Sequence, residues 1–376
     1  MGETMTKFCD KIEKSFGGIY RGKKVIVTGH TGFKGAWLSQ WLMELGAEVH
    51  GLSLYVPSEP ALFTELNWSG PLSNNAVDIR SRADVSKFFA KVQPSIVFHL
   101  AAQPIVSESF RDPHTTFETN ALGTLNILSA IKETSSVKSA VVITSDKCYE
   151  NVEWEFGYRE DDALGGKDPY SASKACAEII FSSFFRSFLA DGSPSLKIAT
   201  TRAGNVIGGG DWAKDRIIPD CIKSWASGKT VQLRSPNSTR PWQHVLDPLS
   251  GYLLLGQKLF ENTPYINGES FNFGPPATVN FPVSDLVAKL SQIFDTTAKF
   301  EIVQNNLKEA GLLKLCCDKA LHRLKWRPTL EYQHTVEMTG SWYRDFYFKK
   351  VPAKELTIGQ IHQYTELARS TSQSWT

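Results

Sequence analysis

The chain lacks an excess of charge of either sign. Its 41 Lys and Arg side chains nearly balance 39 Asp and Glu side chains, which leaves a formal net charge of +2 over 376 residues. A balanced surface offers no general attraction to nucleic acid or to an anionic membrane. We therefore expect no nucleic-acid partner, and any anionic ligand must be held by a few well-placed cations.

Long apolar runs and clustered cysteines are also missing. No stretch approaches the ~18 consecutive apolar residues of a membrane helix, and residues 1–21 lack the apolar core of a signal peptide. The six cysteines contain no Cys-x-x-Cys pair, and only Cys316 and Cys317 are close in sequence. This pattern excludes a zinc framework and a disulfide scaffold. We expect no membrane partner, no metal site and reduced thiols in a cytoplasmic protein.

The first half of the chain alternates between strand and helix patterns. Buried strands are expected at 24–28, 48–53, 96–99, 140–144 and 196–202, and helices at 35–45, 82–92, 115–132 and 170–189. Ser81 is the expected N-cap of the helix at 82–92. Alternation of this kind is typical of a parallel sheet covered by helices on both faces. The predicted fold class is α/β, with a doubly wound sheet of the Rossmann type.

The alternation loosens after residue 203. Shorter elements are expected there, namely helices near 247–259 and 284–294 and strands near 271–273 and 299–303. Residues 54–72 are expected to form a long loop. We predict a dinucleotide-binding domain over 1–202, to which segments near 245–275 return, and a smaller α/β lobe over 203–376.

A glycine-rich turn follows the first strand and precedes a helix. Its glycines permit a sharp turn, a close approach of backbone to pyrophosphate, and packing of helix on sheet. The cofactor-binding residues expected in this turn are Gly29, Thr31, Gly32, Phe33, Lys34 and Gly35. Asp78 and Ile79 are candidates for the adenine pocket, although Asp78 could be an ordinary turn residue.

Two details depart from a usual NAD site. Ser53 occupies the end of the second strand, where an acid would bind the adenosine ribose. His30 and Lys34 add bulk and charge inside the turn. The sequence therefore leaves the choice between NAD and NADP open, and it predicts a modest grip on the cofactor.

A tyrosine and a lysine lie one helical turn apart at Tyr170 and Lys174. An ammonium near a phenol lowers the pKa of the phenol toward neutrality, which makes a base for a sugar hydroxyl. Tyr20 and Lys24 match the same pattern, but they precede the glycine turn. Tyr170 also has Ser145 at the end of a preceding parallel strand, where ligands of such sheets bind.

Ser145 is followed by an acid and a base. Asp146 can protonate a departing hydroxide if it keeps its proton. Lys147 can act as a base if it is desolvated, or it can stabilise an enolate electrostatically. The alternative is that Asp146 and Lys147 form a solvated turn pair. The predicted catalytic residues are Ser145, Asp146, Lys147, Tyr170 and Lys174.

Three stretches carry a resemblance to a known family. Residues 28–35, 143–149 and 202–212 resemble the extended short-chain dehydrogenase/reductases, and within them the nucleotide-sugar 4,6-dehydratases of the CDP-glucose branch. The match runs from about 23 to 343. It implies dehydration of CDP-glucose to a 4-keto-6-deoxy sugar with tightly held NAD, in deoxysugar and O-antigen biosynthesis. Many family members carry Glu as the C5 base where this chain has Lys147, which leaves the base open.

The resemblance also implies roles for further residues and a homodimer. Dimers of this family join through two helices per subunit, and an apolar face of Ile179, Ile180, Phe184 and Phe188 could serve that contact or the core. Asn120 and Trp326 are expected to pack rather than catalyse. The residues implied for the nicotinamide ribose are Leu100, Ala101, Ala102 and Gln103. The residues implied for substrate binding are Asn205, Arg216 and Arg240. Arg216 is the poorest candidate of the three.

Other functions remain open at this point. A dehydratase for another nucleotide sugar or a 4-epimerase of the same family would share most of these motifs. An epimerase expels no hydroxide and so needs no acid after Ser145, which makes Asp146 evidence against it. A dinucleotide-binding sensor without catalysis would not need Ser145, Tyr170 and Lys174 together.

Overall fold

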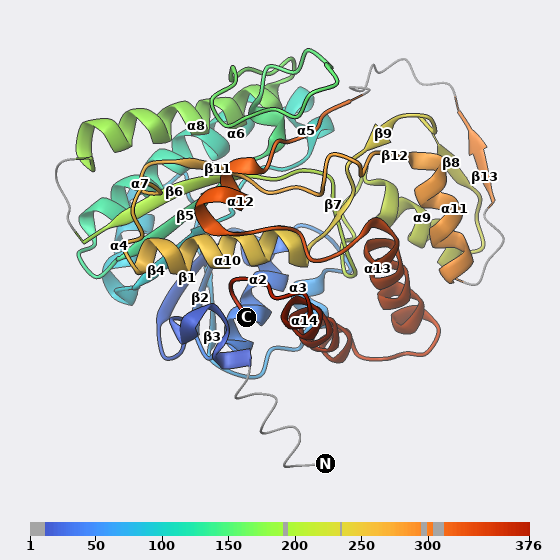
Figure 1. Ribbon diagram of the computed structural model, residues 1–376, viewed down its shortest axis with the longest axis horizontal. Helices are drawn as coiled ribbons and strands as arrows, with labels where there is room; N and C mark the ends of the chain where they lie inside the picture. Colours follow the sequence, from blue (N-terminus) through green and yellow to red (C-terminus); the bar gives the residue numbers. More distant parts are fainter. Residues whose placement is uncertain (1–11, 191–194, 234, 295–298, 304–311) are drawn as a thin grey trace.

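The computed structural model describes residues 12–190, 195–233, 235–294, 299–303 and 312–376 (Figure 1). Cys9 and the first part of the charged N-terminal stretch lie outside the described residues. The centre is a parallel sheet of seven strands in the order β11-β6-β5-β4-β1-β2-β3. Its strands are β1 (Lys24–Thr28), β2 (Glu48–Ser53), β3 (Leu72–Ala76), β4 (Ile96–His99), β5 (Ser139–Ile143), β6 (Lys197–Arg202) and β11 (Ser270–Asn272).

Helices cover both faces of this sheet (Figure 1). Successive strand residues alternate between two apolar layers, as Val25 and Ile26 of β1 do. One layer includes α4 (Arg82–Val92), α7 (Gly123–Glu133) and α8 (Pro169–Phe188). The other includes α2 (Phe33–Glu44), α10 (Leu246–Phe260), α13 (Tyr332–Tyr347) and α14 (Ala353–Ser370). The predicted doubly wound Rossmann-type fold is confirmed.

Most predicted elements of the first half are present. The strands begin and end within one residue of their predicted bounds, and Ser81 caps α4 through a hydrogen bond from the Asp84 amide. The single helix predicted at 115–132 is wrong, because the chain there forms α6 (Pro113–Phe117), a π-helical turn (Glu118–Leu122) and α7. The long loop predicted at 54–72 contains a short helix, α3 (Leu62–Glu65).

The second half supplies short elements beside the main sheet (Figure 1). Three two-stranded sheets pair β7 with β10, β8 with β13 and β9 with β12. Their strands are β7 (Val206–Ile207), β8 (Val231–Leu233), β9 (Thr239–Arg240), β10 (Gln243–His244), β12 (Phe281–Pro282) and β13 (Phe300–Ile302). The helices are α9 (Ile217–Ala226), α11 (Val283–Phe294) and α12 (Asp318–Leu324). In contrast, α10 and β11 return to the main sheet.

The remaining elements are short connections. They are the 3-10 helix η1 (Ser15–Gly18), α5 (Val106–Arg111) and the 3-10 turn η3 (Asp146–Cys148) directly after β5. Among the described residues, no helix combines the length and apolar character needed to cross a membrane.

Candidate active site

The glycine turn packs tightly between β1 and β4. Gly29 has φ +73°, and a Cβ there would lie 2.7 Å from the Ala101 amide nitrogen. A Cβ on Gly35 would lie 2.1 Å from the carbonyl oxygen of Gly29. Both positions therefore require glycine, and α2 begins at Phe33 immediately after Gly32. A helix N-terminus presented by such a turn fits a pyrophosphate.

His30 does not project into the turn, contrary to the expectation that it adds bulk there. Its ring is fully buried, with hydrogen bonds of 2.9 Å to the Ser53 hydroxyl and 2.9 Å to the Asn74 amide oxygen. Burial lowers the pKa of His30. Ser53 also accepts a hydrogen bond from the Thr31 amide at 3.3 Å. The end of β2 is thus occupied by neutral groups joined to one another.

Lys34 adds a cation at the start of α2. Burial, followed by the neighbouring positive charges of Arg216 and Lys174, lowers its pKa to about 8, and Asp146 and Asp211 oppose this shift. These four residues come from three segments that are distant in sequence, near 146, 174 and 211–216. Because all four act on Lys34, the segments meet near the glycine turn, at the carboxyl edge of the sheet where ligands of doubly wound folds bind.

The turn after β5 carries Ser145 and Asp146 into this edge. Asp146 is 5% exposed, and its carboxylate accepts a 3.0 Å hydrogen bond from the Ser145 hydroxyl. Gly204 makes room for it, since a Cβ at 204 would lie 1.7 Å from an Asp146 carboxylate oxygen. Lys147 is exposed, so the desolvation that a lysine base requires is not present.

Tyr170 and Lys174 lie on the face of α8 that packs toward η3, and both are buried. Burial raises the pKa of Tyr170 to about 12, while a hydrogen bond with Ser145 and the charge of Arg216 lower it. The prediction that Lys174 lowers the pKa of this phenol toward neutrality is wrong, because burial outweighs the two groups that lower it, Ser145 and Arg216. Burial also lowers the pKa of Lys174 to about 8.

The segment after β4 joins the glycine turn to α8. The amides of Leu100 and Ala101 donate to the Thr28 hydroxyl at 3.1 and 3.0 Å. Asn120, in the π-helical turn, accepts a hydrogen bond from the Gln103 amide and donates to Ser173 on α8. Ala102 lies between these anchored residues. Asn120 is therefore a buried polar link, consistent with the packing role expected of it.

Asp78 lies after β3 and is engaged by a neighbour. Its carboxylate accepts hydrogen bonds of 2.9 and 2.7 Å from the Arg80 guanidinium, which lower its pKa. Ile79 is buried, and its carbonyl accepts a hydrogen bond from Asn126 on α7. The adenine role of Asp78 and Ile79 stays a prediction.

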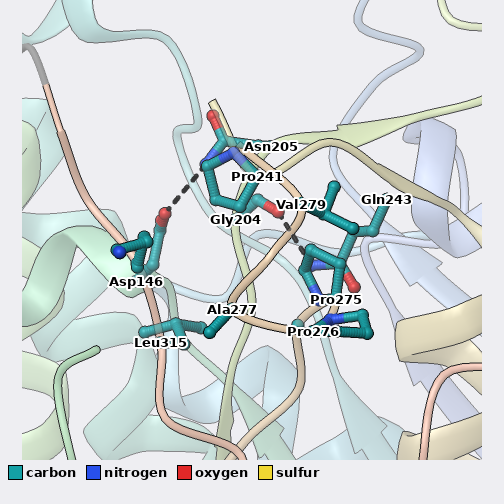
Figure 2. A pocket seen from close by; sticks show the side chains of 12 residues that line it. Asp146, Gly204, Asn205, Pro241, Gln243, Pro275, Pro276, Ala277, Val279 and Leu315 are labelled. Carbon is teal, nitrogen blue, oxygen red and sulfur yellow. Dashed lines mark hydrogen bonds between the residues drawn. The ribbon is translucent and has the colours of Figure 1, made fainter. Parts of the chain in front are cut away.

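A pocket opens beside Asp146 (Figure 2). The Asn205 amide donates to Asp146 at 3.5 Å, and the Gln243 amide donates to the Gly204 carbonyl at 2.8 Å. The lining residues are Asp146, Gly204, Asn205, Pro241, Gln243, Gly274, Pro275, Pro276, Ala277, Val279, Lys314 and Leu315. The sequence analysis missed all lining residues after Asn205. No local motif marks them, because they meet only through the fold.

The two candidate arginines lie in different surroundings. Arg216 precedes α9 and pairs with Asp211 at 2.8 Å. Its charge acts on both Tyr170 and Lys34, so it lies beside the predicted catalytic residues rather than on a remote surface. Arg240 lies on β9, next to the pocket residue Pro241.

A buried ion pair beneath the cluster was also missed. Glu178 on α8 and Arg202 at the end of β6 are 2% and 3% exposed and lie 2.9 Å apart. The sequence contained a signal for Glu178, since it follows Lys174 by one further helical turn on the same face.

Comparison with known proteins identifies the family. A family model described as GDP-mannose 4,6 dehydratase matches residues 26–339. A CDP-glucose 4,6-dehydratase from Salmonella typhimurium is 43% identical over 337 residues, which cover 89% of this chain and 93% of the relative. The chain belongs to the GDP-mannose 4,6 dehydratase family. The resemblance to nucleotide-sugar 4,6-dehydratases is thereby confirmed.

Solved structures of other proteins share the fold. An epimerase from Methanothermobacter thermautotrophicus has a TM-score of 0.76 at 22% identity, covering 91% of this chain and 96% of its own. A dTDP-glucose 4,6-dehydratase from Streptomyces venezuelae, solved with NAD bound, has a TM-score of 0.73 at 21% identity, covering 86% and 97%. Epimerases and dehydratases thus use one scaffold, and the site must distinguish them.

Proposed function

We propose that this chain is an NAD-dependent CDP-glucose 4,6-dehydratase, a hydro-lyase that yields CDP-4-dehydro-6-deoxy-D-glucose. The observation that carries the proposal is the buried Asp146, placed beside Ser145 at the mouth of the pocket. An acid at this point is needed to expel hydroxide and is not needed for epimerisation. The 43% identity to the Salmonella CDP-glucose 4,6-dehydratase supports cytidine as the base.

The described residues fit a dinucleotide. Gly29 and Gly35 leave no space for a Cβ against the neighbouring backbone, which gives the tight turn that a pyrophosphate site needs, and Lys34 offers a cation nearby. The residues that would hold the cofactor are Gly29, Thr31, Gly32, Phe33, Lys34, Gly35, Asp78, Ile79, Leu100, Ala101, Ala102, Gln103, Tyr170 and Lys174. When bound, NAD supplies an acceptor for the C4 hydride and a donor that returns it to C6.

The chain's own groups then move protons. Tyr170 accepts the C4 hydroxyl proton as its phenolate, which the positive charge of a bound nicotinamide ring would favour against the burial that raises its pKa, and Ser145 shares that hydroxyl and orients it. The resulting C4 ketone acidifies the C5 hydrogen, and Asp146 protonates the hydroxide that leaves C6. Lys147 is exposed without substrate, and a bound sugar would desolvate it, so that its neutral amine takes the C5 proton while the protonated Asp146 gives its own proton to the hydroxide.

The substrate role falls to residues of the second half. We assign the lobe over 203–376 to nucleotide-sugar binding, with Asn205 against the sugar diphosphate and Arg216 and Arg240 as its cations. The planar guanidinium matches phosphate oxygens; the charge of Arg216 acts on Tyr170, and Arg240 adjoins the pocket residue Pro241. The domain over 1–202 holds the dinucleotide, together with α10 and β11.

We further propose a cytoplasmic homodimer that contacts its partner through α8 and the neighbouring α7. On the predicted apolar face, Ile179 and Phe188 are 55% and 52% exposed, whereas Phe184 is buried and Ile180 packs against the core. The exposed pair is therefore the part available for a contact. The described cysteines are all free thiols, which supports a reducing compartment.

The decisive experiment is a substrate comparison. The purified protein is incubated with NAD and, separately, CDP-, UDP-, dTDP- or GDP-sugars, and the product is assayed for a 4-keto chromophore in alkali and for a C6 methyl group by NMR. We expect both signals with CDP-glucose. Product only with another nucleotide would overturn the cytidine assignment, and a C4 epimer without loss of water would establish the epimerase alternative.

A further inference from the structure

The buried ion pair between Glu178 and Arg202 reaches both ends of the turn that carries Ser145 and Asp146. Thr144, the residue before Ser145, donates its hydroxyl proton to Glu178 in a short hydrogen bond. Tyr149, the residue after η3, accepts a 2.8 Å hydrogen bond from the Arg202 guanidinium. The turn is thus anchored on its two sides by two members of one pair.

Glu178 also connects α8 to neighbouring strands. Its carboxylate accepts hydrogen bonds from Arg202 at 2.9 Å and from Thr200 at 3.0 Å, both on β6. It also accepts from Ser270 on β11 at 3.2 Å. Because Tyr170, Lys174 and Glu178 follow one another along the same face of α8, these bonds also hold the helix that carries the tyrosine.

Arg202 uses both ends of its planar group. One nitrogen contacts Glu178, and the other donates to Tyr149 and, at 2.8 Å, to the Glu160 carbonyl. The guanidinium carbon lies 4.8 Å from the centre of the Tyr149 ring. A lysine in place of Arg202 would have a single side-chain nitrogen, which could not reproduce the two-sided, planar arrangement of these hydrogen bonds.

We propose that Glu178 and Arg202 are positioning residues, which together hold the Ser145–Asp146 turn and the Tyr170–Lys174 helix in register. This inference rests on the proposed function, which places those four residues at the reacting sugar. Burying an ion pair costs free energy, and replacing one with apolar groups is often neutral for stability. At a reaction centre, accurate placement of the reacting groups increases the rate, which is a reason to keep an ion pair that adds little stability.

The charge of Glu178 acts on Lys174 directly. Burial lowers the pKa of Lys174 to about 8, and Cys148 and Glu178 oppose this. Burial raises the pKa of the Cys148 thiol well above its usual range, so at neutral pH Glu178 is the anion of the two. The other titratable groups that interact with Lys174 are His99 and Lys34, which add no negative charge.

A matched pair of hydroxyl deletions tests the positioning role. Tyr149→Phe removes the bond between Arg202 and the turn, and Thr200→Val removes a bond to Glu178 that does not involve the turn. We expect kcat to fall about tenfold in Tyr149→Phe and less than about twofold in Thr200→Val, with equal NAD binding by fluorescence titration. Equal kcat values in the two variants would overturn the proposal.

A pH profile tests the electrostatic role. Glu178→Gln keeps the size of the side chain and removes its charge, so the pKa of Lys174 falls. The alkaline limb of kcat should then move about one pH unit lower, and Glu178→Asp should restore it in part. An alkaline limb at the same pH as in the wild type would refute this role. If Glu178→Gln does not fold, the comparison of Tyr149→Phe with Thr200→Val still tests the positioning role. Wild-type enzyme that fails to dehydrate CDP-glucose would instead refute the proposed function.

Discussion

Two carboxylates are buried on opposite faces of the main sheet, and they are held in different ways. Glu178 on α8 faces Arg202. Burial raises the pKa of Glu178, but the positive charge of Arg202 and the hydrogen bonds to the carboxylate outweigh burial, so the pKa is lowered. Asp247 on α10 accepts hydrogen bonds of 2.8 Å from the Thr329 amide and 2.8 Å from the Tyr364 hydroxyl. Both of these donors are neutral. Burial raises the pKa of Asp247 to about 7.

The contrast separates two kinds of region. The catalytic edge, between β5, β6 and α8, keeps buried charges that act on the groups of the site. The core between α10, α14 and the 326–330 segment uses polar groups to join elements and has aromatic packing around them. We therefore expect substitutions in the first region to change turnover and substitutions in the second to change stability.

The largest effect is expected at the catalytic edge. Tyr170→Phe removes the proposed proton acceptor and should lower kcat about 10³-fold. Substrate affinity by calorimetry and the urea midpoint should stay close to those of the wild type, because the ring and its packing remain. A fully active Tyr170→Phe enzyme would show that another group takes the C4 proton.

The space for Asp146 provides a second test of this edge. Gly204→Ala places a Cβ 1.7 Å from the carboxylate, so the acid must move, and we expect kcat to fall about 10²-fold. Gly359→Ala in α14 is the matched control, since no atom lies within 4 Å of its added Cβ. It should leave kcat unchanged and raise the unfolding free energy by about 0.5–1 kcal/mol. Retained activity in Gly204→Ala would remove Asp146 from the mechanism.

The opposite behaviour is expected of Trp326. Its indole is 1% exposed, donates to the Ser250 hydroxyl at 3.0 Å and packs edge-on against Phe273. Trp326→Phe should lower the unfolding free energy by about 2 kcal/mol in urea titrations without changing kcat. Trp154→Phe makes the same change at a side chain that is 41% exposed, and it should cost less than about 0.5 kcal/mol. A lower kcat in Trp326→Phe would contradict the expectation that substitutions in this core change stability alone.

A further test of the second region concerns pH and Asp247. Its pKa is about 7 in the folded chain and about 3.9 when unfolded. Its contribution to stability is therefore complete below the unfolded value and is lost as pH rises toward 7, by about 1.4 kcal/mol per pH unit. Asp247→Asn should flatten the decline in urea midpoint between pH 5 and 7. An identical decline in both proteins would mean that Asp247 does not titrate in this interval.

The sheet and its catalytic edge could be predicted from sequence because both rest on local patterns. Buried strands such as 24–28 are short apolar runs, and Ser145 and Tyr170 lie where such strands and their helices meet. In contrast, β3 (Leu72–Ala76) is a polar edge strand that gains its structure from pairing with β2. Its Asn-rich sequence indicates a loop, so it was missed.

The C-terminal helices and the surroundings of the site were harder to predict. Both α13 and α14 carry charged residues among their buried ones, which weakens the apolar period that reveals a helix. The pocket wall combines segments near 204, 241, 274 and 314 that only the fold brings together. The pKa of Tyr170 depends on burial, which no spacing of residues predicts.

The return of β11 to the main sheet limits how this enzyme can be divided. β11 pairs with β6 and gives that strand its second neighbour, although β11 follows more than sixty positions later. A chimera joined at a single point near residue 203 would separate these partners and leave β6 as an open margin. Exchange of substrate preference between relatives should therefore transplant an internal cassette with two junctions, and α10 and β11 should come from the recipient.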